Sequence, residues 1–379
     1  ANKNWKVTEK VTTAFTRLDI DSTLMGIPVR GNAGVQLVHT DQGSDAYQAS
    51  TNGASCPGDV CALAPAHGGT SYYDVLPSVN LVGDLGSGQT LRLGLGRQMA
   101  RPTLNDMRAS FNFSWNSTTN VCPNNATGCL TGDAGNPALK PFRATALDVS
   151  YEKYFGTKAY FSAAAFYKSL SSYILRVNGP FDYAGYNLSA AGMPNANSPT
   201  LGSLSRPMNG TGGNVEGIEL SASLPLSMAT SWLDGFGIQA SFSNTNSSLN
   251  LNTLGFNTGG ITLPSIPLPG LSKQVANLTF YYEAHGFSAR IGQRYRSDFL
   301  GNITSFTGDS QYTFIHSEKI TDAQISYEFE SGPMKGLSVL VQGNNLTNTP
   351  YIEYLGDRNN PSKKVSYGKT FLFGLNYKL

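Results

Sequence analysis

The chain has 379 residues and combines 41 glycines, 19 tyrosines and 19 phenylalanines with only 14% charged residues. Soluble globular proteins average about 25% charged residues. Few charges together with many aromatic residues and glycines favour a β-rich protein. The formal net charge of +2 gives no strong field of one sign, which argues against a nucleic-acid partner or a polybasic membrane anchor. No stretch approaches 18 consecutive apolar residues, which excludes an ordinary transmembrane helix but not a β-barrel.

Thirteen segments with the period-2 pattern of β-strands follow one another along the chain. Residues 147–152 show the pattern well, because they read Leu-Asp-Val-Ser-Tyr-Glu and alternate between the two faces of a strand. Many segments exceed the five or six residues usual in globular sheets and suit a tilted membrane span of about 9 to 11 residues. The predicted strands cover about 5–22, 29–48, 70–85, 90–108, 139–155, 159–181, 214–227, 235–250, 271–285, 287–301, 318–331, 336–355 and 366–379.

The connections between these segments switch regularly between short and long. Short, turn-like connections fall near 23–28, 86–89, 156–158, 228–234, 286 and 332–335. Long connections rich in Asn, Gly, Ser and Pro fall near 49–69, 109–138, 182–213, 251–270, 302–317 and 356–365. This alternation is typical of outer-membrane barrels, which have short periplasmic turns and long external loops. The sequence therefore predicts an all-β fold, a transmembrane antiparallel β-barrel.

The number of predicted strands is odd. If the short turns are periplasmic, the last strand ends on the periplasmic side and the first begins outside, whereas complete bacterial barrels have even strand numbers and periplasmic ends. We therefore expect residues 1–379 to be the C-terminal portion of a larger plugged barrel of about 22 strands. On this reading the plug domain and the N-terminal strands are absent from the chain.

The four cysteines form two close pairs inside predicted loops, Cys56 with Cys61 and Cys122 with Cys129. Local disulfides in an oxidising compartment account for this arrangement. A zinc site is the alternative, and it is weaker because no histidine lies within a few residues of either pair.

Aromatic residues in two long loops are candidates for ligand binding. Phe111, Phe113 and Trp115 occupy alternate positions at the start of the 109–138 loop, and Tyr183 and Tyr186 open the 182–213 loop. Such rings are able to stack on the apolar faces of sugars, but an aromatic girdle or a loop-packing cluster is an equally good explanation. The same two interpretations apply to Tyr72 and Tyr73.

Three arginines share one face of the segment 287–301, namely Arg290, Arg294 and Arg296. A charge on the lipid face near the midplane costs about 2 to 4 kcal/mol, so we expect these side chains to point into the lumen. There they would pair with acidic residues of neighbouring strands or of the plug, or attract an anionic cargo. We favour the structural role.

The sequence contains no recognisable catalytic centre. Its four histidines, at positions 39, 67, 285 and 316, are far apart, and there is no Gly-X-Ser-X-Gly motif. Phosphate-binding loops and metal-ligand spacings are also missing. We therefore predict no enzyme activity, no catalytic residues, no metal site and no cofactor.

Several motifs together resemble the C-terminal half of TonB-dependent receptors, particularly the subfamily of Xanthomonas- and Caulobacter-like bacteria. They are Arg30-Gly-Asn-Ala-Gly-Val-Gln-Leu-Val-His-Thr-Asp41, Leu76-Pro-Ser-Val-Asn80, Ala100-Arg-Pro-Thr-Leu104, Asn136-Pro-Ala-Leu-Lys-Pro141, Gly213-Asn-Val-Glu-Gly-Ile-Glu219 and Gly343-Asn-Asn-Leu-Thr-Asn-Thr-Pro-Tyr351. The closing stretch 367–379 looks like the final barrel strand, although it ends in Leu379 where the family usually has Phe.

The resemblance implies an active transporter in the outer membrane of a Gram-negative bacterium, in contact with outer-membrane lipid. Its cargo would be a scarce small solute, with an oligosaccharide preferred and an iron–siderophore as the alternative on the same fold. The implied partners are the rest of the receptor, including the plug, and the TonB–ExbB–ExbD complex acting through that plug. A passive porin and a soluble secreted β-sandwich or adhesin are the rival classes.

Overall fold

The computed structural model describes residues 4–49, 63–116, 129–156, 158–186, 188, 200–254, 263–303 and 312–378. Within these ranges the chain consists of β-strands joined by turns, loops and three short 3₁₀ helices, η4 (Leu226–Met228), η5 (Ser231–Leu233) and η6 (Leu251–Thr253). No helix in the same ranges is long and apolar enough to cross a membrane.

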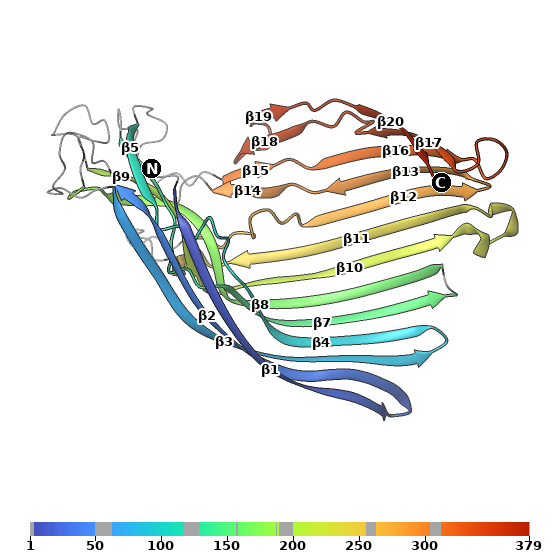
Figure 1. Cartoon of the computed structure of the whole chain (residues 1–379), viewed down its shortest axis with the longest axis horizontal. Coiled ribbons are helices and arrows are strands. Elements are labelled where there is room, and N and C mark those ends of the chain that lie inside the picture. Colours follow the sequence, from blue (N-terminus) through green and yellow to red (C-terminus); the bar gives the residue numbers. More distant parts are fainter. Residues whose placement is uncertain are drawn as a thin grey trace.

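Thirteen antiparallel strands form one continuous sheet, which we call the wall (Figure 1). Each strand overlaps one of the thirteen predicted segments, so the prediction of these strands is confirmed. The strands of the wall are β1 (Lys6–Leu24), β2 (Ile27–Ala49), β3 (Leu63–Gly86), β4 (Gln89–Ala100), β7 (Phe142–Phe155), β8 (Ala159–Asp182), β10 (Gly213–Pro225), β11 (Phe236–Leu249), β12 (Gln274–Ala284), β13 (Phe287–Arg296), β16 (Glu318–Glu328), β17 (Leu337–Asn344) and β20 (Thr370–Tyr377).

Two predicted segments run far past the ends of their strands. The segment 90–108 ends as a strand at Ala100, because Pro102 follows and has no N–H to donate to a sheet. The segment 336–355 breaks after β17, where Asn345 and Asn348 both adopt a φ of +52° and turn the chain. In both places the local backbone ends the strand, and the strand pattern alone does not show where.

The short connections all lie at one end of the wall, which we call the turn end, and the long connections lie at the opposite loop end (Figure 1). In three of the short turns both turn residues have a positive φ, between +50° and +81°. This is the backbone twist that matches two antiparallel strands in a tight hairpin. The residue pairs are Met25 with Gly26, Ser87 with Gly88, and His285 with Gly286.

The two faces of the wall differ in polarity. Cross-strand partners share a face, and the register aligns an apolar row across neighbouring strands. This row contains Leu81, Leu93, Val149, Ala165 and Ile218. Leu93 and Val149 are each 39% exposed and Ile218 is 49% exposed, so the apolar face is open to its surroundings, as a lipid-facing surface is. A soluble β-sandwich would cover such a face with a second sheet.

An aromatic belt borders the apolar face at the turn end. The rings of Phe236 and Tyr282 are 4.5 Å apart between centroids, and those of Tyr282 and Phe287 are 6.0 Å apart. On the next strands Tyr327 and Phe329 form an edge-to-face pair at 4.9 Å. Aromatic residues mark the membrane–water boundary of transmembrane barrels, which is the position this belt would take.

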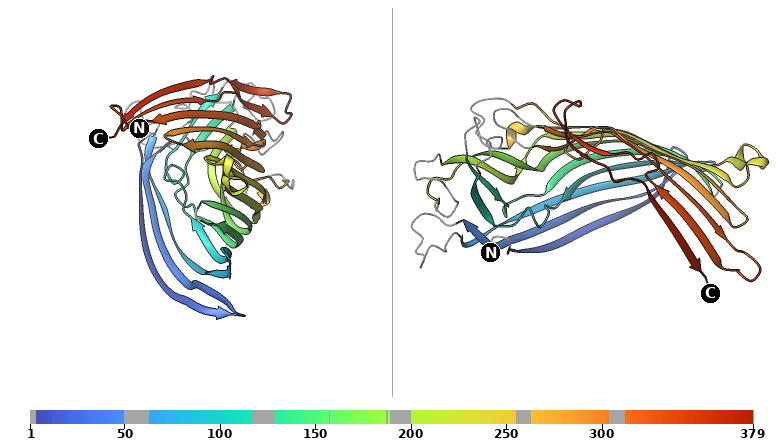
Figure 2. Two further views of the ribbon diagram at one scale, coloured as in Figure 1. Left: turned by 90° about the vertical axis from the view of Figure 1, so that its right-hand side faces the viewer. Right: turned by 90° about the horizontal axis from the view of Figure 1, so that it is seen from above.

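The wall is curved and open (Figure 2). Among the described residues β1 pairs only with β2, and β20 pairs only with β17, so these two strands are the edges of the wall. Both edge strands run from the loop end to the turn end, because the wall has an odd number of strands and each runs antiparallel to the next.

At the loop end, three further strands link β2 to β8 and so close part of the wall into a circuit. They are β5 (Phe111–Asn116), β6 (Cys129–Ala134) and β9 (Leu201–Gly210). β5 pairs in parallel with β2, β6 pairs with β5, β9 pairs in parallel with β6, and β9 also pairs with β8. The circuit β2–β3–β4–β7–β8–β9–β6–β5 therefore closes on itself. Two of the predicted loops, 109–138 and 182–213, thus contain strands.

A second, smaller sheet forms from the last two long connections. It contains β14 (Phe299–Ile303), β15 (Tyr312–Ile315), β18 (Tyr351–Leu355) and β19 (Pro361–Val365). The largest buried apolar cluster lies beside it at the loop end and includes Tyr173, Leu249 and Leu300. Burial in the described chain is therefore concentrated where the long connections pack on the wall, and the spanning part has little core of its own.

Candidate functional site

Two segments fold over the inner, polar face of the wall at its loop end. Gln42 holds one of them, because its side-chain amide donates to the carbonyl oxygens of Pro137 and Leu139, each at 2.8 Å. Ser44 holds the other by accepting a hydrogen bond from the backbone N–H of Ala109 at 2.9 Å. Leu139 is fully buried as a result. The family-like motif at 136–141 thus has a structural role, since it fills the inside of the circuit of strands.

An ion pair lies beneath these segments. Arg143 donates to both carboxylate oxygens of Asp74, at 2.5 and 3.2 Å, and the Asp74 side chain is only 3% exposed. The guanidinium of Arg143 also lies 5.5 Å from the centre of the buried Tyr72 ring. Tyr73, by contrast, is 76% exposed and stacks on His39 at 4.3 Å. Tyr72 and Tyr73 therefore lie apart from the five aromatic residues predicted in the two long loops.

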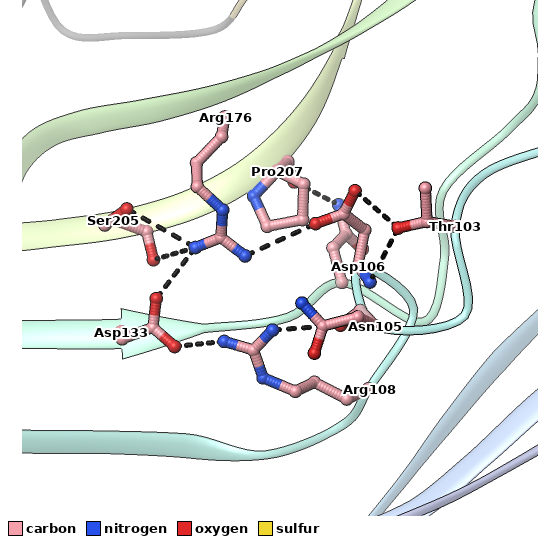
Figure 3. Close-up of polar contacts among 9 residues, drawn as sticks. Thr103, Asn105, Asp106, Arg108, Asp133, Arg176, Ser205 and Pro207 are labelled. Carbon is pink, nitrogen blue, oxygen red and sulfur yellow. Dashed lines mark hydrogen bonds and ion pairs between the residues drawn. The ribbon is translucent and has the colours of Figure 1, made fainter. Parts of the chain in front are cut away.

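Beside this pair, four charged residues form what we call the arginine–aspartate network (Figure 3). Asp133 on β6 accepts from Arg108 and from Arg176, whose Nη1 lies 2.7 Å from the Asp133 carboxylate. Arg176, on β8, also contacts Asp106 at 3.4 Å. The network joins three parts of the chain that are far apart in the sequence. It is partly open to solvent, because the Asp133 side chain is 48% exposed and that of Arg176 is 36% exposed.

The five predicted ligand-binding aromatics come together in one cluster next to this network. Phe111 and Tyr183 are buried in it, whereas Phe113, Trp115 and Tyr186 pack against it and remain partly exposed. The Tyr183 hydroxyl donates to the Ser203 carbonyl oxygen at 2.6 Å. Burial, and to a lesser extent the neighbouring Tyr186, raises the pKa of Tyr183. Phe111 and Tyr183 thus pack inside this loop-packing cluster, and ligand binding by the five residues stays a prediction.

The three predicted arginines of β13 all pair with β16. Arg290 donates to Gln324 at 2.5 Å, Arg294 contacts Asp322 at 3.3 Å, and Arg296 contacts Glu318 at 2.7 Å. Arg290 and Arg294 line an open polar cavity of about 510 Å³ together with Thr279, Tyr281 and Gln342. All three arginines therefore have a polar or acidic partner on β16, while Arg294, 64% exposed, keeps much of its surface free, and their role stays a prediction.

A family profile described as TonB dependent receptor-like, beta-barrel matches residues 3–346. The chain belongs to this family. Members of the family are receptors and transporters of the Gram-negative outer membrane rather than enzymes. No curated protein matches the chain.

Solved structures of siderophore receptors share the fold. A mutant of the ferric enterobactin receptor PfeA of Pseudomonas aeruginosa, in complex with enterobactin, has a TM-score of 0.59 at 17% identity, over 98% of this chain and 54% of PfeA. The siderophore receptor PirA of Acinetobacter baumannii gives 0.56 at 13%, over 98% and 55%. The ferric-catecholate import receptor Fiu of E. coli K12 gives 0.55 at 15%, over 98% and 45%. This TonB-dependent receptor-like chain thus spans about half the length of these proteins, and the likeness shows the fold alone.

Of the predicted disulfide residues, only Cys129 is among the described residues. It is disulfide-bonded, while Cys56, Cys61 and Cys122 lie outside the described ranges. The pairing of Cys122 with Cys129, and that of Cys56 with Cys61, stay predictions. In the described part of the chain no group of three metal-ligating side chains comes together.

Sequence reasoning missed the arginine–aspartate network. Its members come from the turn after β4, from β6 and from β8, and no spacing in the sequence relates Asp106, Asp133 and Arg176. One signal was present, since Asp133 lies in the 109–138 loop with Phe111, Phe113 and Trp115, and Arg176 precedes Tyr183 by seven residues. The non-local pairing of β6 with β9 is what brings these groups together.

Proposed function

We propose that this chain forms the C-terminal wall of an outer-membrane active transporter that imports a scarce small solute. The observation that carries this proposal is the two-sided wall, apolar and open on one face and polar on the other, which suits a barrel with lipid outside and a solute pathway inside. Membership of the TonB-dependent receptor-like family supports the same conclusion.

The two free edges indicate what the wall needs to become a barrel. Backbone N–H and C=O groups within a bilayer must be paired, so both β1 and β20 require partner strands. Because β1 and β20 run in the same direction, pairing them directly, or through a second copy of the chain, would create parallel seams in an antiparallel barrel. An odd number of additional antiparallel strands avoids this, and about nine would complete a barrel of about 22 strands. We assign them, with the plug, to the remainder of the receptor.

We further propose that transport is driven through that plug by the TonB–ExbB–ExbD complex. A barrel of about 22 strands is wide enough to need a plug, and the inner face of this wall carries many exposed polar and charged groups that suit a polar occupant. Arg294 at 64% exposure and Arg17 at 59% are examples. A passive porin, the rival class, would leave the pore open and would need no energy source.

For the cargo we prefer a ferric siderophore to an oligosaccharide. The solved structures of similar fold are siderophore receptors, which supports this choice although identity is low. The preference for an oligosaccharide followed from the resemblance to one subfamily, with the aromatic rings as candidate platforms for sugars. Two of these five rings, Phe111 and Tyr183, are buried. The partly exposed Trp115 and Tyr186 are the remaining candidates for stacking on either cargo.

Uptake measurements test the proposal. The receptor polypeptide that carries this sequence would be expressed in a Gram-negative host lacking its own siderophore receptors, with and without TonB. We expect TonB-dependent uptake of ⁵⁵Fe supplied as ferric enterobactin or another catecholate chelate. TonB-dependent uptake of a labelled oligosaccharide, with no iron uptake, would instead support the second cargo. Solute flux that is the same without TonB would contradict active transport and favour a porin.

A further inference from the structure

We propose that Arg108 and Arg176 form a binding site for an anionic group, a carboxylate or a phosphate, and that the Asp133 carboxylate is its resting occupant (Figure 3). The proposal deepens the proposed function, because it assigns a contact for an anionic part of the cargo. Its first test is a binding measurement that does not depend on transport.

The geometry around Asp133 is that of a bound anion. One carboxylate oxygen meets Nη2 of Arg108, and the other meets Nη1 of Arg176 at 2.7 Å. Two guanidinium groups thus converge on one carboxylate and supply one N–H to each oxygen. Charge-assisted hydrogen bonds from arginine to carboxylate or phosphate oxygens are short and strong, so the same two N–H groups suit either anion.

The two arginines have other partners that keep them in place when Asp133 leaves. Nη1 of Arg108 donates to the carbonyl oxygen of Asn105 at 2.9 Å. Arg176 lies 3.4 Å from the Ser205 hydroxyl and 3.4 Å from the Asp106 carboxylate. The cradle for an anion is therefore preorganised, which lowers the cost of exchanging one carboxylate for another.

Charge balance favours such an exchange. Arg108 and Arg176 together carry two positive charges, and Asp106 and Asp133 carry two negative ones, so the resting network is neutral. When Asp133 withdraws, the cradle has a net charge of +1 and attracts an anion. Because the Asp133 side chain is 48% exposed, an anion in the lumen can reach the position it holds.

The strand that carries Asp133 is held to its neighbour over a short distance. Among the residues that the structure describes, β6 pairs with β9 only from Thr131 to Asp133, and β5 joins β2 through a single pair, Gln48 with Phe111. Asp133 is thus the last paired residue on that side of β6. We expect a movement at this end of β6 to take the Asp133 carboxylate out of the cradle. Because β6 pairs with β5, this movement would couple anion binding to the position of the aromatic residues of β5.

Phosphate binding to the detergent-purified receptor tests this proposal. ³¹P NMR titration with inorganic phosphate would be compared between the native protein and Asp133→Asn, which keeps the side-chain shape. If Asp133 occupies the cradle about nine-tenths of the time, removing its charge tightens phosphate binding about tenfold. The double variant Asp133→Asn with Arg176→Gln should lose this gain.

A matched control separates the cradle from a general change of charge. Asp148→Asn removes one negative charge from β7, where the described chain shows no ion pair to Asp148, and it should leave phosphate affinity unchanged. Unaltered affinity in Asp133→Asn, or an equal gain in Asp148→Asn, would overturn the proposal. Hydrogen exchange of residues 111–116 and 129–134 adds a second readout: faster exchange in Asp133→Asn without tighter phosphate binding would mean that Asp133 only braces the hairpin. Since no uptake is measured, these results stand apart from those for transport.

Discussion

The orientation of the wall can be tested with two neighbouring alanines on β8. Ala165 pairs with Val149 and Ile218 on the apolar face, whereas Ala164 pairs with Ser150 and Glu219 on the polar face. An arginine at position 165 would enter the lipid near the middle of the apolar row, which costs about 2 to 4 kcal/mol. An arginine at position 164 would face the lumen beside the Glu219 carboxylate and should cost much less.

The difference between Ala165→Arg and Ala164→Arg is large enough to measure. A cost of about 2 to 4 kcal/mol lowers the ratio of folded to unfolded protein by a factor of about 30 to 800. Both variants would be unfolded with urea in phospholipid vesicles, and their free energies of unfolding compared with that of the native receptor. Equal destabilisation by the two arginines, or a larger effect at position 164, would refute the assignment of faces.

Three further predictions concern the loop end. Tyr183→Phe removes a buried hydroxyl and leaves the Ser203 carbonyl without its donor, so it should destabilise the receptor by about 1 to 3 kcal/mol in a urea titration. Asp74→Asn leaves the Arg143 charge buried without its partner and should cost about 3 to 5 kcal/mol by the same measurement. At Asp298, burial acts to raise the pKa, but hydrogen bonds from Tyr354 and Ser317 outweigh it and lower the pKa below its ordinary value. The stability that ionised Asp298 contributes is present above about pH 4 and is lost as the pH falls through the lowered pKa. The protection of residues 351–355 against hydrogen exchange, measured relative to the intrinsic exchange rate at each pH, should therefore fall in acid, and Asp298→Asn should abolish this pH dependence.

The wall could be predicted from the sequence because its signals are local. Alternation along one strand shows which side chains share a face, and turns such as Ser87-Gly88 mark the tight hairpins. Consecutive strands pair with each other through most of the wall, so the order along the chain is also the order in the sheet. The odd number of strands could be predicted for the same reason, because it required only the number of segments and the lengths of their connections.

The candidate site could be predicted only in part. The aromatic residues were visible because Phe111, Phe113 and Trp115 alternate and Tyr183 and Tyr186 open the next long loop, yet nothing in the sequence distinguished rings that pack from rings that bind. That distinction depends on burial, and Tyr183 is fully buried by a hairpin that begins about seventy residues earlier. The arginine–aspartate network depends on the same long-range packing.

The closed circuit at the loop end requires strands to approach unusually closely, and glycines permit this. A Cβ atom at Gly202 would lie 2.0 Å from the Leu130 carbonyl oxygen, and one at Gly132 would lie 2.4 Å from the Tyr183 hydroxyl oxygen. Glycine-rich loops are ordinarily read as flexible, but here the missing side chains allow β6 and β9 to pair and the aromatic cluster to pack against them. Composition alone therefore cannot separate a mobile loop from one whose glycines fix it in place. At the loop end of this wall, Gly132 and Gly202 are part of what holds Asp133 and the aromatic rings beside β9.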